Sequence, residues 1–485
     1  MRFNRTLPSA LLAAMILAAC GGGDTVVYVP TEPTAPVVQG TVVTAAQMND
    51  TDLNAIFAAA KEGDTVTLPP GKYSFKGPLQ ITNKKKITVL GAGNGTDPTS
   101  NTILSFAKAL AQNGIDAAGL DTVTFKKFAI EDASGNGVFV NQSKNVVMDT
   151  LRTEWMINPF GTSKMVYGLY PVSSDNVKIV NSKAVGTRDA GVYVGQSTNI
   201  LVAKNTVVNN VAGIEIENSY NAIVEDNDVY DNTGGILVFA LKAPPRFKTT
   251  ENVVVRNNRI TDNNTPPFVN ASGLVLTIPP GTGVMVLASQ NVEVYNNTIT
   301  KHKTTGVLLI SAYAAGEEDN SGIKDSQGKV YDNFGKGNYV HNNTIKDFGY
   351  APGGAFAKPG SEGGLKDFTD AFMAGYKNFP AVMWDGVMDP NPAVSAGVDV
   401  STGYPLGGNY TGNYKVCSTA NGVTPPVTSV GVSYQNLDLN LFGLMTQTSS
   451  FAFPNPPRLE KSGANACTIT PVSYTHLTLP TNREV

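Results

Sequence analysis

Glycines recur at a nearly fixed interval along the middle of this chain, and this spacing constrains the fold more than any other feature. Each of these glycines opens a short apolar segment: Gly114, Gly137, Gly168, Gly191, Gly213, Gly235, Gly283 and Gly306. The intervals are 23, 31, 23, 22, 22, 48 and 23 residues, so the two long ones correspond to one or two repeats with an insertion. Such a period is typical of a solenoid, in which each repeat stacks only on its neighbours. Because the repeat contains no helical pattern, we expect coils made of strands and turns.

Asparagines occupy two fixed positions in each repeat. The first lies eight residues after the glycine, at Asn145, Asn176, Asn199, Asn221 and Asn291. The second lies six residues further on, at Asn205, Asn227 and Asn297, and the same spacing joins Asn252 to Asn258. Asn tolerates left-handed backbone, and its amide can bond a neighbouring coil. Because stacked coils lie about 4.8 Å apart, we interpret these residues as structural ladders.

This pattern resembles the right-handed parallel β-helix superfamily, the pectate-lyase-like fold, and within it the carbohydrate-binding and sugar-hydrolysis type of repeat, over about residues 40–348. The spacing predicts a β-solenoid, and the handedness follows from the resemblance. We expect an all-β right-handed parallel β-helix over residues 41–348, with coils of about 22 residues. The resemblance implies no catalytic residue, because neither the Asp-Pro-His motif of mannuronan C5-epimerases nor the Asp cluster of polygalacturonases is recognisable.

The first segment of the expected β-helix carries one clear helical pattern, at residues 51–62. Its apolar residues follow the spacing i, i+3, i+4 and i+7, at Leu53, Ile56, Phe57 and Ala60. Asp50 or Thr51 is expected to cap this helix, and Gly63 to end it. A solenoid needs a cover over its open first coil, so we expect an N-terminal capping helix.

The N-terminus has the pattern of a bacterial lipoprotein signal. Arg2 and Arg5 precede a short apolar run, and Cys20 is followed by three glycines, as in a lipobox. We therefore expect a signal peptide at 1–19, a lipid on Cys20 and an extended tether at 20–40. The protein would then be held at a bacterial outer membrane or cell surface, facing the periplasm or the exterior. An ordinary signal peptide cleaved before a small residue is the alternative.

The C-terminal part loses the repeat. Residues 349–472 are rich in Gly, Pro, Phe and Tyr, and we expect an irregular extension packed on the last coils. With Cys20 lipidated, Cys417 and Cys467 remain as a pair, which an oxidising periplasm would convert to a disulfide. Residues 473–485 resemble a translated sequencing adapter, so we interpret them as an artefact and leave them out of fold reasoning.

Composition narrows the possible partners. The net charge is −3 and 15% of residues are charged, with no basic stripe of the kind that nucleic-acid binding requires. We therefore expect no nucleic-acid partner.

The residues after each glycine divide into two faces, because side chains alternate along a strand. Positions +1 and +3 are uniformly aliphatic and are expected to face the interior, as at Val138/Val140 and Val192/Val194. Positions +2 and +4 then face outward. The middle of this outward row is aromatic and acidic, with Phe139, Tyr170, Tyr193, Glu215 and Glu217. Its far end is apolar, with Leu237, Phe239, Met285, Leu287, Leu308 and Ile310.

The aromatic and acidic part of the row is the predicted site, and a polysaccharide is its predicted partner, because tyrosines suit sugar rings with apolar faces and polar edges. Our candidate catalytic residues are Arg188, Asp189, Tyr193, Glu215 and Glu217. Our candidate substrate-binding residues are Phe139, Asn141, Tyr170 and Lys164. Each of these residues also has a purely structural interpretation. Arg188 and Asp189 would form an ion pair in a turn, the tyrosines would form an aromatic stack, and the two glutamates would be solvated residues of the sheet.

Two reactions fit these residues. In a lyase or epimerase reaction on uronates, Arg188, Lys164 or a bound Ca²⁺ ion would neutralise the substrate carboxylate, and Tyr193 or a Lys or Arg residue would abstract the C5 proton. In hydrolysis, two carboxylates must flank the bond. Glu215 and Glu217 are two residues apart on one face, which separates their Cβ atoms by about 7 Å, near the range of inverting enzymes.

A non-catalytic scaffold or binding module is the alternative function. Monomers rarely leave a large apolar patch bare. Either the insertion at 240–282 and the C-terminal extension cover the apolar end of the row, which we prefer, or a protein partner or hydrophobic ligand docks there. A cleft with Arg188, Tyr193 and Glu215 converging would favour an enzyme, and a row buried under the C-terminal extension would favour the scaffold. His302 and His341 lie in expected turns and are interpreted as surface residues.

Overall fold

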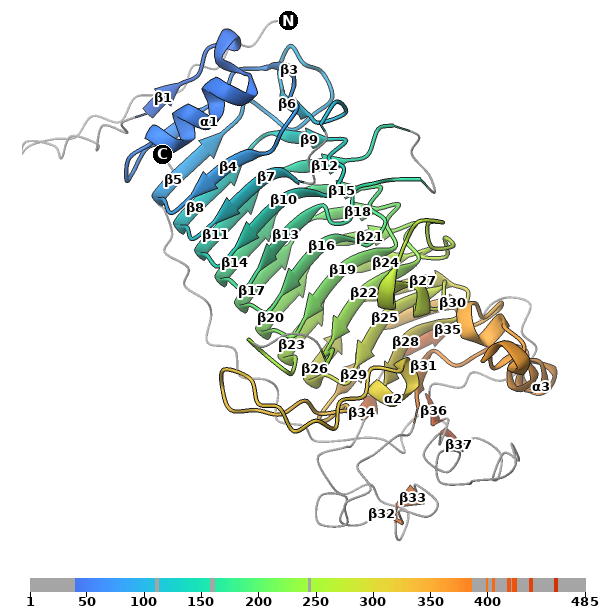
Figure 1. The fold of residues 1–485 in the computed structure, drawn as a ribbon. Coiled ribbons are helices and arrows are strands. Elements are labelled where there is room, and N and C mark those ends of the chain that lie inside the picture. Colours follow the sequence, from blue (N-terminus) through green and yellow to red (C-terminus); the bar gives the residue numbers. More distant parts are fainter. Residues whose placement is uncertain are drawn as a thin grey trace, which may run out of the picture. The chain divides into compact units, whose positions relative to one another are not determined.

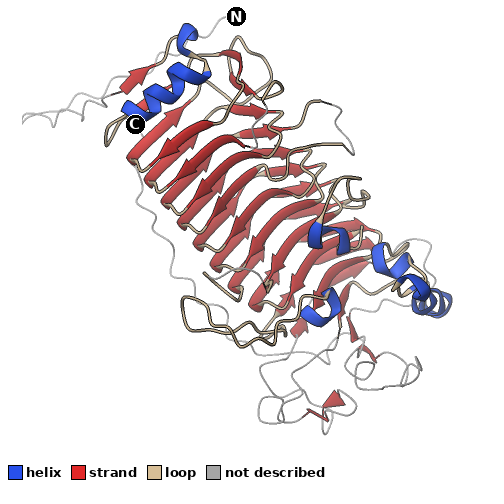
Figure 2. Cartoon of the chain, viewed as in Figure 1, coloured by secondary structure: helices blue, strands red, loops and turns tan. Residues whose placement is uncertain are grey.

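The computed structural model describes residues 40–109, 113–157, 162–242 and 246–385, with short strand segments between 398 and 460. The chain divides into one unit at residues 1–38 and another at residues 39–485, and all described residues belong to the second. In this part of the chain, three long sheets run side by side, and each coil contributes one strand to each sheet (Figures 1 and 2). The β-helix predicted from the glycine spacing is therefore confirmed.

Sheet 1 pairs its strands in parallel from the N-terminal coil onward. Its strands are β1 (Gly40–Val42), β2 (Thr65–Thr67), β5 (Lys85–Leu90), β8 (Asp121–Lys126), β11 (Lys144–Asp149), β14 (Asp175–Val180), β17 (Thr198–Ala203), β20 (Tyr220–Glu225), β23 (Glu251–Arg256), β26 (Gln290–Tyr295), β29 (Tyr339–His341) and β34 (Cys417–Thr419).

Sheet 2 contains the strands that follow the repeating glycines, and its outer face carries the candidate site. Its strands are β4 (Leu79–Thr82), β7 (Asn113–Ala118), β10 (Asn136–Asn141), β13 (Leu169–Val172), β16 (Ala190–Gly195), β19 (Ala212–Glu217), β22 (Gly234–Phe239), β25 (Thr282–Leu287), β28 (Thr305–Ile310), β31 (Val382–Trp384), β36 (Asn436–Asp438) and β37 (Arg458–Glu460). All described pairs are parallel except β36–β37.

Sheet 3 consists mostly of three-residue strands. They are β3 (Gly71–Ser74), β6 (Thr102–Ser105), β9 (Ala129–Glu131), β12 (Arg152–Glu154), β15 (Lys183–Val185), β18 (Thr206–Val208), β21 (Asp228–Tyr230), β24 (Arg259–Thr261), β27 (Thr298–His302), β30 (Thr344–Phe348) and β35 (Gly422–Thr424). A separate antiparallel pair is formed by β32 (Val398–Asp399) and β33 (Tyr404–Pro405).

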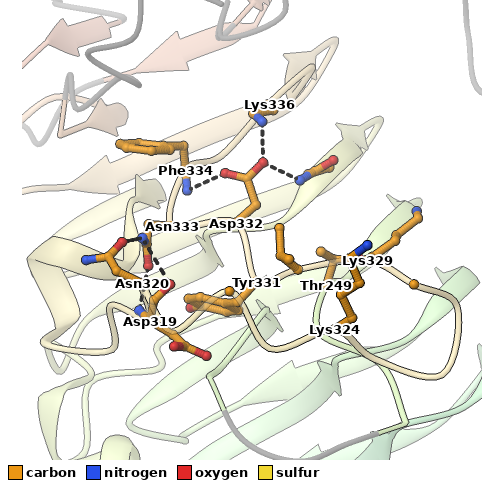
Figure 3. Close-up of a pocket in the computed structure, with 14 residues that line it drawn as sticks. Thr249, Asp319, Asn320, Lys324, Lys329, Tyr331, Asp332, Asn333, Phe334 and Lys336 are labelled. Atoms are coloured by element: carbon orange, nitrogen blue, oxygen red, sulfur yellow. Dashed lines mark hydrogen bonds and ion pairs between the residues drawn. The ribbon is translucent and has the colours of Figure 1, made fainter.

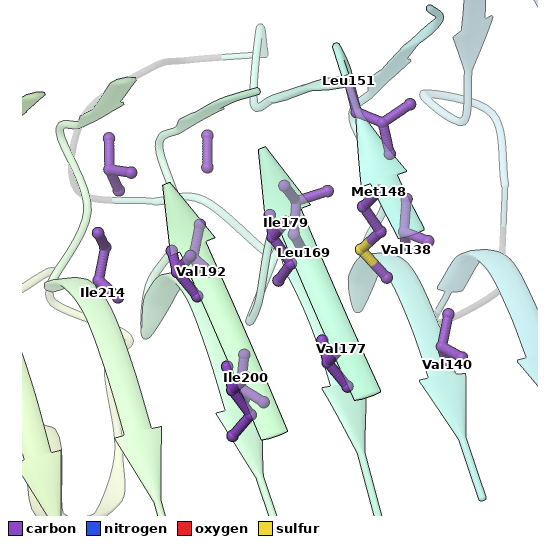
Figure 4. Packing of buried hydrophobic residues seen from close by; sticks show 14 of the residues in the cluster. Val138, Val140, Met148, Leu151, Leu169, Val177, Ile179, Val192, Ile200 and Ile214 are labelled. Carbon is purple, nitrogen blue, oxygen red and sulfur yellow. The ribbon is translucent and has the colours of Figure 1, made fainter. Parts of the chain in front are cut away.

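The interior is a continuous aliphatic column filled from all three sheets. Val138, Val140, Val192 and Val194 are completely buried, as their positions +1 and +3 predicted. Figure 4 shows such residues from successive coils stacked above one another, including Val138, Leu169, Val192 and Ile214. Stacking like side chains in every coil buries apolar area at a favourable free energy of about 25 cal/mol per Å².

The repeating glycines are required by close packing inside the coil. A Cβ atom at Gly137 would lie 2.6 Å from the carbonyl oxygen of Gly168 in the next coil. It would also lie 2.8 Å from Cγ2 of Thr153 in sheet 3. The glycine therefore occupies the interior corner where sheet 3 meets sheet 2, and any larger residue there would push two coils apart.

The predicted asparagine ladders are present. In the outer ladder, Asn176 donates from Nδ2 to Oδ1 of Asn145 at 2.8 Å, and Asn199 donates to Asn176 at 3.0 Å, with φ between 53° and 56° at all three. In the inner ladder, both the backbone N–H and the Nδ2 of Asn205 donate to Oδ1 of Asn227 at 3.0 Å. The inner ladder satisfies buried backbone groups at a turn, which would otherwise cost stability.

A third ladder was not recognised in the sequence, and it corrects the interpretation of His302. Asn210 donates from Nδ2 to Oδ1 of Asn232 at 3.0 Å, Asn232 donates to Asn263 at 2.8 Å, and Asn263 lies 3.2 Å from Nε2 of His302. His302 thus takes the place of an asparagine and is completely buried, so its prediction as a surface residue was wrong. His341 is only partly exposed and pairs with Glu293 at 2.7 Å.

The helices lie at the two ends and on the insertions of the described β-helix (Figure 2). The capping helix is α1 (Asp50–Ala59), and its N-cap is Asn49, whose side chain accepts from the N–H of Asp52, where we had expected Asp50 or Thr51. Leu53 and Phe57 of α1 are buried against the first coil. The other helices are η1 (Ala45–Gln47), η2 (Gly273–Thr277), α2 (Ala312–Ala315), η3 (Gly354–Ala357), η4 (Gly360–Glu362) and α3 (Lys366–Tyr376). Within the described residues, none of the helices has the length and apolar character needed to cross a membrane.

The β-helix continues beyond the boundary expected at residue 348. β31 pairs with β28, β34 with β29 and β35 with β30, all in parallel, so these three strands add to the three sheets in turn. The segment between β30 and β31, which contains α3, folds back over sheet 2. Long excursions between these strands hid the additional coil from the spacing pattern.

Candidate active site

The outward row of sheet 2 is a true column in the structure. The register places Phe139 beside Asp116 on one side and Tyr170 on the other, and it continues from Tyr193 to Glu215. The neighbouring outward column, two residues further along each strand, contains Asn141, Val172, Gly195 and Glu217. The candidate residues Phe139, Asn141, Tyr170, Tyr193, Glu215 and Glu217 are thus brought onto one face by strand stacking alone.

Tyrosines form a packed group in the middle of this face. The rings of Tyr170 and Tyr193 meet edge to face at 4.9 Å between centroids, and Phe139 lies 5.1 Å from Tyr170. Tyr167 contacts both Tyr170 and Tyr193, at 4.5 and 4.7 Å. The aromatic stack proposed from the sequence therefore exists, with one additional member.

Tyr167 was missed because strict alternation from Gly168 would turn it inward. The chain bends at the repeating glycine, so the glycine and the next residue both face the interior and the residue before the glycine faces outward. The same position holds Asn113 and Asn136 in the preceding coils, where Asn136 donates from Nδ2 to Oδ1 of Asn113 at 2.8 Å. Polar or aromatic residues directly before the glycine are the signal that would have identified this column.

Three carboxyl groups converge beside the tyrosines. Tyr167 lies close enough to Asp189 to lower its pKa, Tyr193 lies close enough to Glu217 to lower its pKa, and Glu217 raises the pKa of Glu215. Glu215 is 3% exposed, whereas Asp189 and Glu217 are half-buried. Oδ1 of Asp189 and Oε2 of Glu215 are buried atoms without a hydrogen-bond partner among the described residues. The cluster therefore holds buried carboxyl oxygens whose acceptor capacity is unused.

Burial is the main cause of unusual protonation in this cluster. It raises the pKa of Asp189 to about 7, although the hydrogen bond from Tyr167 opposes the shift. It raises the pKa of Glu217 to about 7, against hydrogen bonds from Tyr193 and Glu215. Burial and the neighbouring Asp189 and Glu217 raise the pKa of Glu215 well above its usual value. At neutral pH the cluster therefore holds one protonated carboxyl beside two that titrate near neutrality.

The tyrosines shift in the direction that keeps them protonated. Burial, together with Glu217 and Glu215, raises the pKa of the Tyr193 phenol well above its usual value. Burial likewise raises the pKa of Tyr170 to about 12. These phenols can donate hydrogen bonds to the carboxyls, but their ionised forms are strongly disfavoured.

The cationic candidates form no ion pair with the carboxyl cluster among the described residues, although the charge of Arg188 lowers the pKa of Asp189. Arg188 donates to the carbonyl oxygen of Asn270 at 3.1 Å and to Oγ of Ser272 at 3.4 Å, in the insertion between β24 and β25. Lys164 is exposed. Arg152, in β12, is buried in an ion pair with Glu131 of β9 at 2.6 Å on sheet 3. The structure thus brings together Tyr193, Asp189 and both glutamates, and it directs Arg188 toward a loop.

The apolar end of the row is covered by the chain itself. Leu237 and Phe239 are completely buried, and Met285 and Leu308 are 2% exposed. They pack with residues of the insertion and of the segment before β31, namely Phe268, Ala271, Val275, Ile278, Phe356, Phe368, Phe372 and Phe379. The preferred expectation, cover by the chain's own insertion and C-terminal extension, is confirmed for these residues. A hollow of about 440 Å³ remains over Met285, Leu308 and Ile310.

A second hollow, of about 680 Å³, lies in the insertion between β28 and β29 (Figure 3). Its charged residues mostly bond one another. Asp332 pairs with Lys336 and accepts from Gln290 at 3.0 Å, and Asp319 lies 3.6 Å from Lys248. This network stabilises the loop, because buried charges require such partners.

Three further predictions concern metals and cysteines. In the described part of the chain, no group of three or more His, Cys, Asp or Glu residues is arranged to hold a metal ion. Cys20 and Cys467 lie outside the described residues, so the lipidation and the disulfide remain predictions. Cys417 lies in β34.

Comparison with known proteins places the chain in a family. The family described as "Right handed beta helix region" matches at residues 87–248, 160–316 and 241–356. The chain is similar to the A-module of mannuronan C-5 epimerase AlgE4 from Azotobacter vinelandii, with 14% identity, a TM-score of 0.43, and coverage of 80% of this chain and 94% of that chain. It is also similar to an exopolygalacturonase from Thermotoga maritima, with 12% identity, a TM-score of 0.40 and coverage of 64% and 78%.

A third similar structure is the DFA-IIIase from Arthrobacter chlorophenolicus A6 without its lid, with 13% identity, a TM-score of 0.39 and coverage of 80% of this chain and 87% of that chain. No curated protein matches the sequence. The family match spans more than half of the chain and agrees with the three stacked parallel sheets. This chain belongs to the right-handed β-helix family.

Proposed function

We propose that this protein is a carbohydrate-active enzyme that hydrolyses glycosidic bonds of a polysaccharide with the carboxyl cluster of sheet 2. One observation carries the proposal: three carboxyl groups gather on the outer face of sheet 2, where burial raises the pKa of Glu215 well above its usual value and the pKa values of Asp189 and Glu217 to about 7. Glycoside hydrolysis requires a protonated carboxyl and an ionised carboxylate at one site, and a difference in environment is the usual way to separate their roles.

The roles follow from the contacts. Glu215 gives its proton to the glycosidic oxygen, the bond from that oxygen to the anomeric carbon breaks, and a water oxygen attacks this carbon. Asp189 accepts the proton of that water, and the Tyr167 hydrogen bond favours its ionised form. Glu217 raises the pKa of Glu215 and so keeps it protonated, while Tyr193 lowers the pKa of Glu217.

Glu215 and Glu217 do not form the pair that flanks the bond. Glu217 raises the pKa of Glu215, so its role is to keep the acid protonated rather than to act as the opposing base. Asp189, on the turn before β16, is therefore the better partner for Glu215. The separation of about 7 Å between the Cβ atoms of Glu215 and Glu217 follows from the strand geometry alone and does not set the distance between the carboxyl groups.

Hydrolysis is better supported than elimination on a uronate. The raised pKa of Tyr193 disfavours the phenolate that would abstract a C5 proton. The guanidinium of Arg188 is directed to Asn270, so it does not offset the charge of a substrate carboxylate beside Glu217. A neutral sugar avoids repulsion with ionised Asp189 and Glu217.

Burial of the apolar row beneath the insertion and the segment before β31, together with the direction of Arg188, meets the criterion stated above for a scaffold. The same burial removes the surface on which a protein partner or hydrophobic ligand would dock, so a binding module would have to use the carboxyl cluster itself. The carboxyl cluster in turn costs stability, since raised pKa values mean that folding disfavours the ionised groups. Such a cluster is characteristic of a functional site rather than of a surface used only for stacking.

The test is a screen of neutral and uronate polysaccharides with a form that lacks residues 1–23, with and without Ca²⁺. New reducing ends without absorbance of unsaturated uronates are expected. Glu215→Gln should lower the rate at least about a hundredfold, as loss of a general acid does. The matched control is Glu225→Gln, which lies on the outer face of sheet 1 beside Arg256 and should keep full activity. Unsaturated products lost in Tyr193→Phe would establish a lyase instead, and a folded protein inactive on every polymer would favour a binding module.

We also propose that Cys20 carries a lipid and that residues 20–40 act as a tether to a bacterial membrane. The support is the lipobox-like sequence alone. Expression of the full chain with radiolabelled palmitate should label the protein, and Cys20→Ser should abolish both the label and membrane recovery. Equal membrane recovery of the two forms would contradict the anchor.

A further inference from the structure

Exposure decreases in one direction along the outer face of sheet 2. In the central column, Gln80 is exposed, and Asp116, Phe139 and Tyr170 are half-buried. From Tyr193 onward the column closes: exposure is 6% at Tyr193, 3% at Glu215, and at most 2% at Leu237, Met285 and Leu308. The carboxyl cluster therefore lies at the inner end of a strip that is open toward β4.

The two flanking columns also close, one at β16 and the other two coils later, at β22. On the later side, Thr82 is exposed, Asn141 and Glu217 are half-buried and Phe239 is completely buried. On the other side, Asn113, Asn136 and Tyr167 are half-buried, whereas Ala190 and Ala212 are completely buried. All three columns become buried between β16 and β22, so another part of the chain covers the sheet from these strands onward. We call this covering segment the wall.

The wall is the insertion between β24 and β25. Its residues Phe268, Val275 and Ile278 pack on the outer face of sheet 2 with Ala212 and Leu237. Asn270 fixes the insertion by donating from Nδ2 to the carbonyl oxygen of Ser163 at 2.7 Å. Arg188, directly before Asp189, holds the same loop through Asn270 and Ser272. Arg188 is thus a positioning residue between the wall and the cluster.

The open strip is suited to a sugar chain. Phe139 offers an aromatic face, and Asn113 donates from Nδ2 to Oδ2 of Asp116 at 3.1 Å. Asn136 is half-buried and donates from Nδ2 to Oδ1 of Asn113 at 2.8 Å, so the strip also carries an amide pair. Sugars bind to such combinations of aromatic faces and amide or carboxyl groups because their rings have apolar faces and polar edges.

We infer that the enzyme acts on chain ends: a polysaccharide lies across β4, β7, β10 and β13, and only its terminal sugars reach Asp189 and Glu215. This inference rests on the proposed function and adds its mode of action. The wall leaves no continuation of the strip beyond β19, so a bond inside a long chain has no path for the sugars on its far side. Hydrolysis then releases one short product per event, with water as the co-reactant.

The test compares chain length with product formation on the polymer that the screen identifies. Chain-end action predicts that reducing ends accumulate while the viscosity and the main size-exclusion peak of the polymer change little, and that one short sugar dominates from the earliest times. Chemical blocking of the chain ends should abolish the reaction. A rapid fall in viscosity with a ladder of products would overturn the inference and leave the proposed function intact. No cleavage of any polymer would overturn both.

A variant pair tests the position of the strip independently. Phe139→Ala should raise KM about tenfold for chains of six or more sugars, the loss expected for one aromatic contact, and should raise KM much less for the shortest cleavable substrate. The matched control Leu201→Ala, on the outer face of sheet 1, should change neither value. Equal effects of Phe139→Ala on short and long substrates would overturn the placement of the chain.

Discussion

Glu217, two residues further along β19, raises the pKa of buried Glu215. Residues two apart on a strand share a face, so their carboxyl groups are close in space. In this buried setting the neighbouring carboxyl favours the protonated form of Glu215. The interaction couples the protonation of the proposed acid to that of its neighbour, and it makes the site sensitive to pH.

Activity should depend on pH in a bell-shaped manner. The rate should rise as pH increases through about 7, because Asp189 must lose its proton to act as a base. It should fall at higher pH as Glu215 loses its own proton. Tyr167→Phe removes the hydrogen bond that lowers the pKa of Asp189, so the acidic limb should move to higher pH. The profile of kcat/KM checks this, with Tyr170→Phe as the matched control; an unmoved limb in Tyr167→Phe would assign the base to another group.

The contribution of the carboxyl cluster to stability should decrease as pH rises, in the direction opposite to that of His302 discussed below. The pKa values of Asp189 and Glu217 are raised to about 7 in the folded protein. Below the unfolded-state pKa values both groups are protonated in the folded and the unfolded state, so they do not make stability depend on pH there. Between those values and pH 7 the unfolded chain loses protons that the folded protein retains, so the free energy of unfolding falls. Glu217→Gln should reduce this slope between pH 5 and 8 in urea unfolding, whereas Leu201→Ala should keep it. An unchanged slope in Glu217→Gln would mean that Glu217 ionises freely in the folded protein.

The repeating glycines should tolerate no side chain. Gly137→Ala places a Cβ 2.6 Å from the carbonyl oxygen of Gly168, so two coils must separate. Overpacking of this kind destabilises by about 1–3 kcal/mol. Gly360→Ala is the control, because its Cβ would meet only Oδ2 of Asp367 at 3.9 Å. Thermal unfolding should show a lower Tm for Gly137→Ala alone, and equal Tm values would contradict the close packing of the corner.

The burial of His302 should lower the free energy of unfolding at acidic pH. Burial lowers its pKa from 6.5 to about 3, so the folded protein holds it neutral while the unfolded chain protonates it. The free energy of unfolding should therefore fall as pH decreases from about 6.5 toward 3. His302→Asn should continue the ladder of Asn263, fold normally and lose this part of the acid sensitivity. Urea unfolding at pH 4 and 7 checks the prediction, and a variant as acid-sensitive as the parent would refute it.

Most of the architecture could be read from residues that repeat. The period of about 22 residues identified the coils, the aliphatic positions at Val138 and Val140 identified the interior, and the asparagine spacing identified two ladders. These features are local in each coil, because every repeat contacts mainly its neighbours. The third ladder escaped notice because its last described member is His302 rather than an asparagine.

The site could be predicted only in part. The sequence placed Tyr193, Glu215 and Glu217 on one face, since alternation and register depend on spacing alone. It missed Tyr167, whose direction is set by the bend at Gly168. It also assigned Arg188 and Asp189 to one site, although Asp189 belongs to the carboxyl cluster and Arg188 donates to the loop at Asn270. A residue at a bend takes its direction from the turn, which a two-residue alternation does not describe.

The sequence by itself determined the coil, its interior and the row of outward residues, because a period and an alternation are sufficient to assign them. Only the tertiary structure decided that the row is open at Gln80 and closed at Leu237, since the closing residues belong to an insertion and a C-terminal segment with no repeat of their own. That burial removes water from Glu215 and raises its pKa. The chemistry of the cluster therefore depends on contacts between segments far apart in the chain, which no local pattern records.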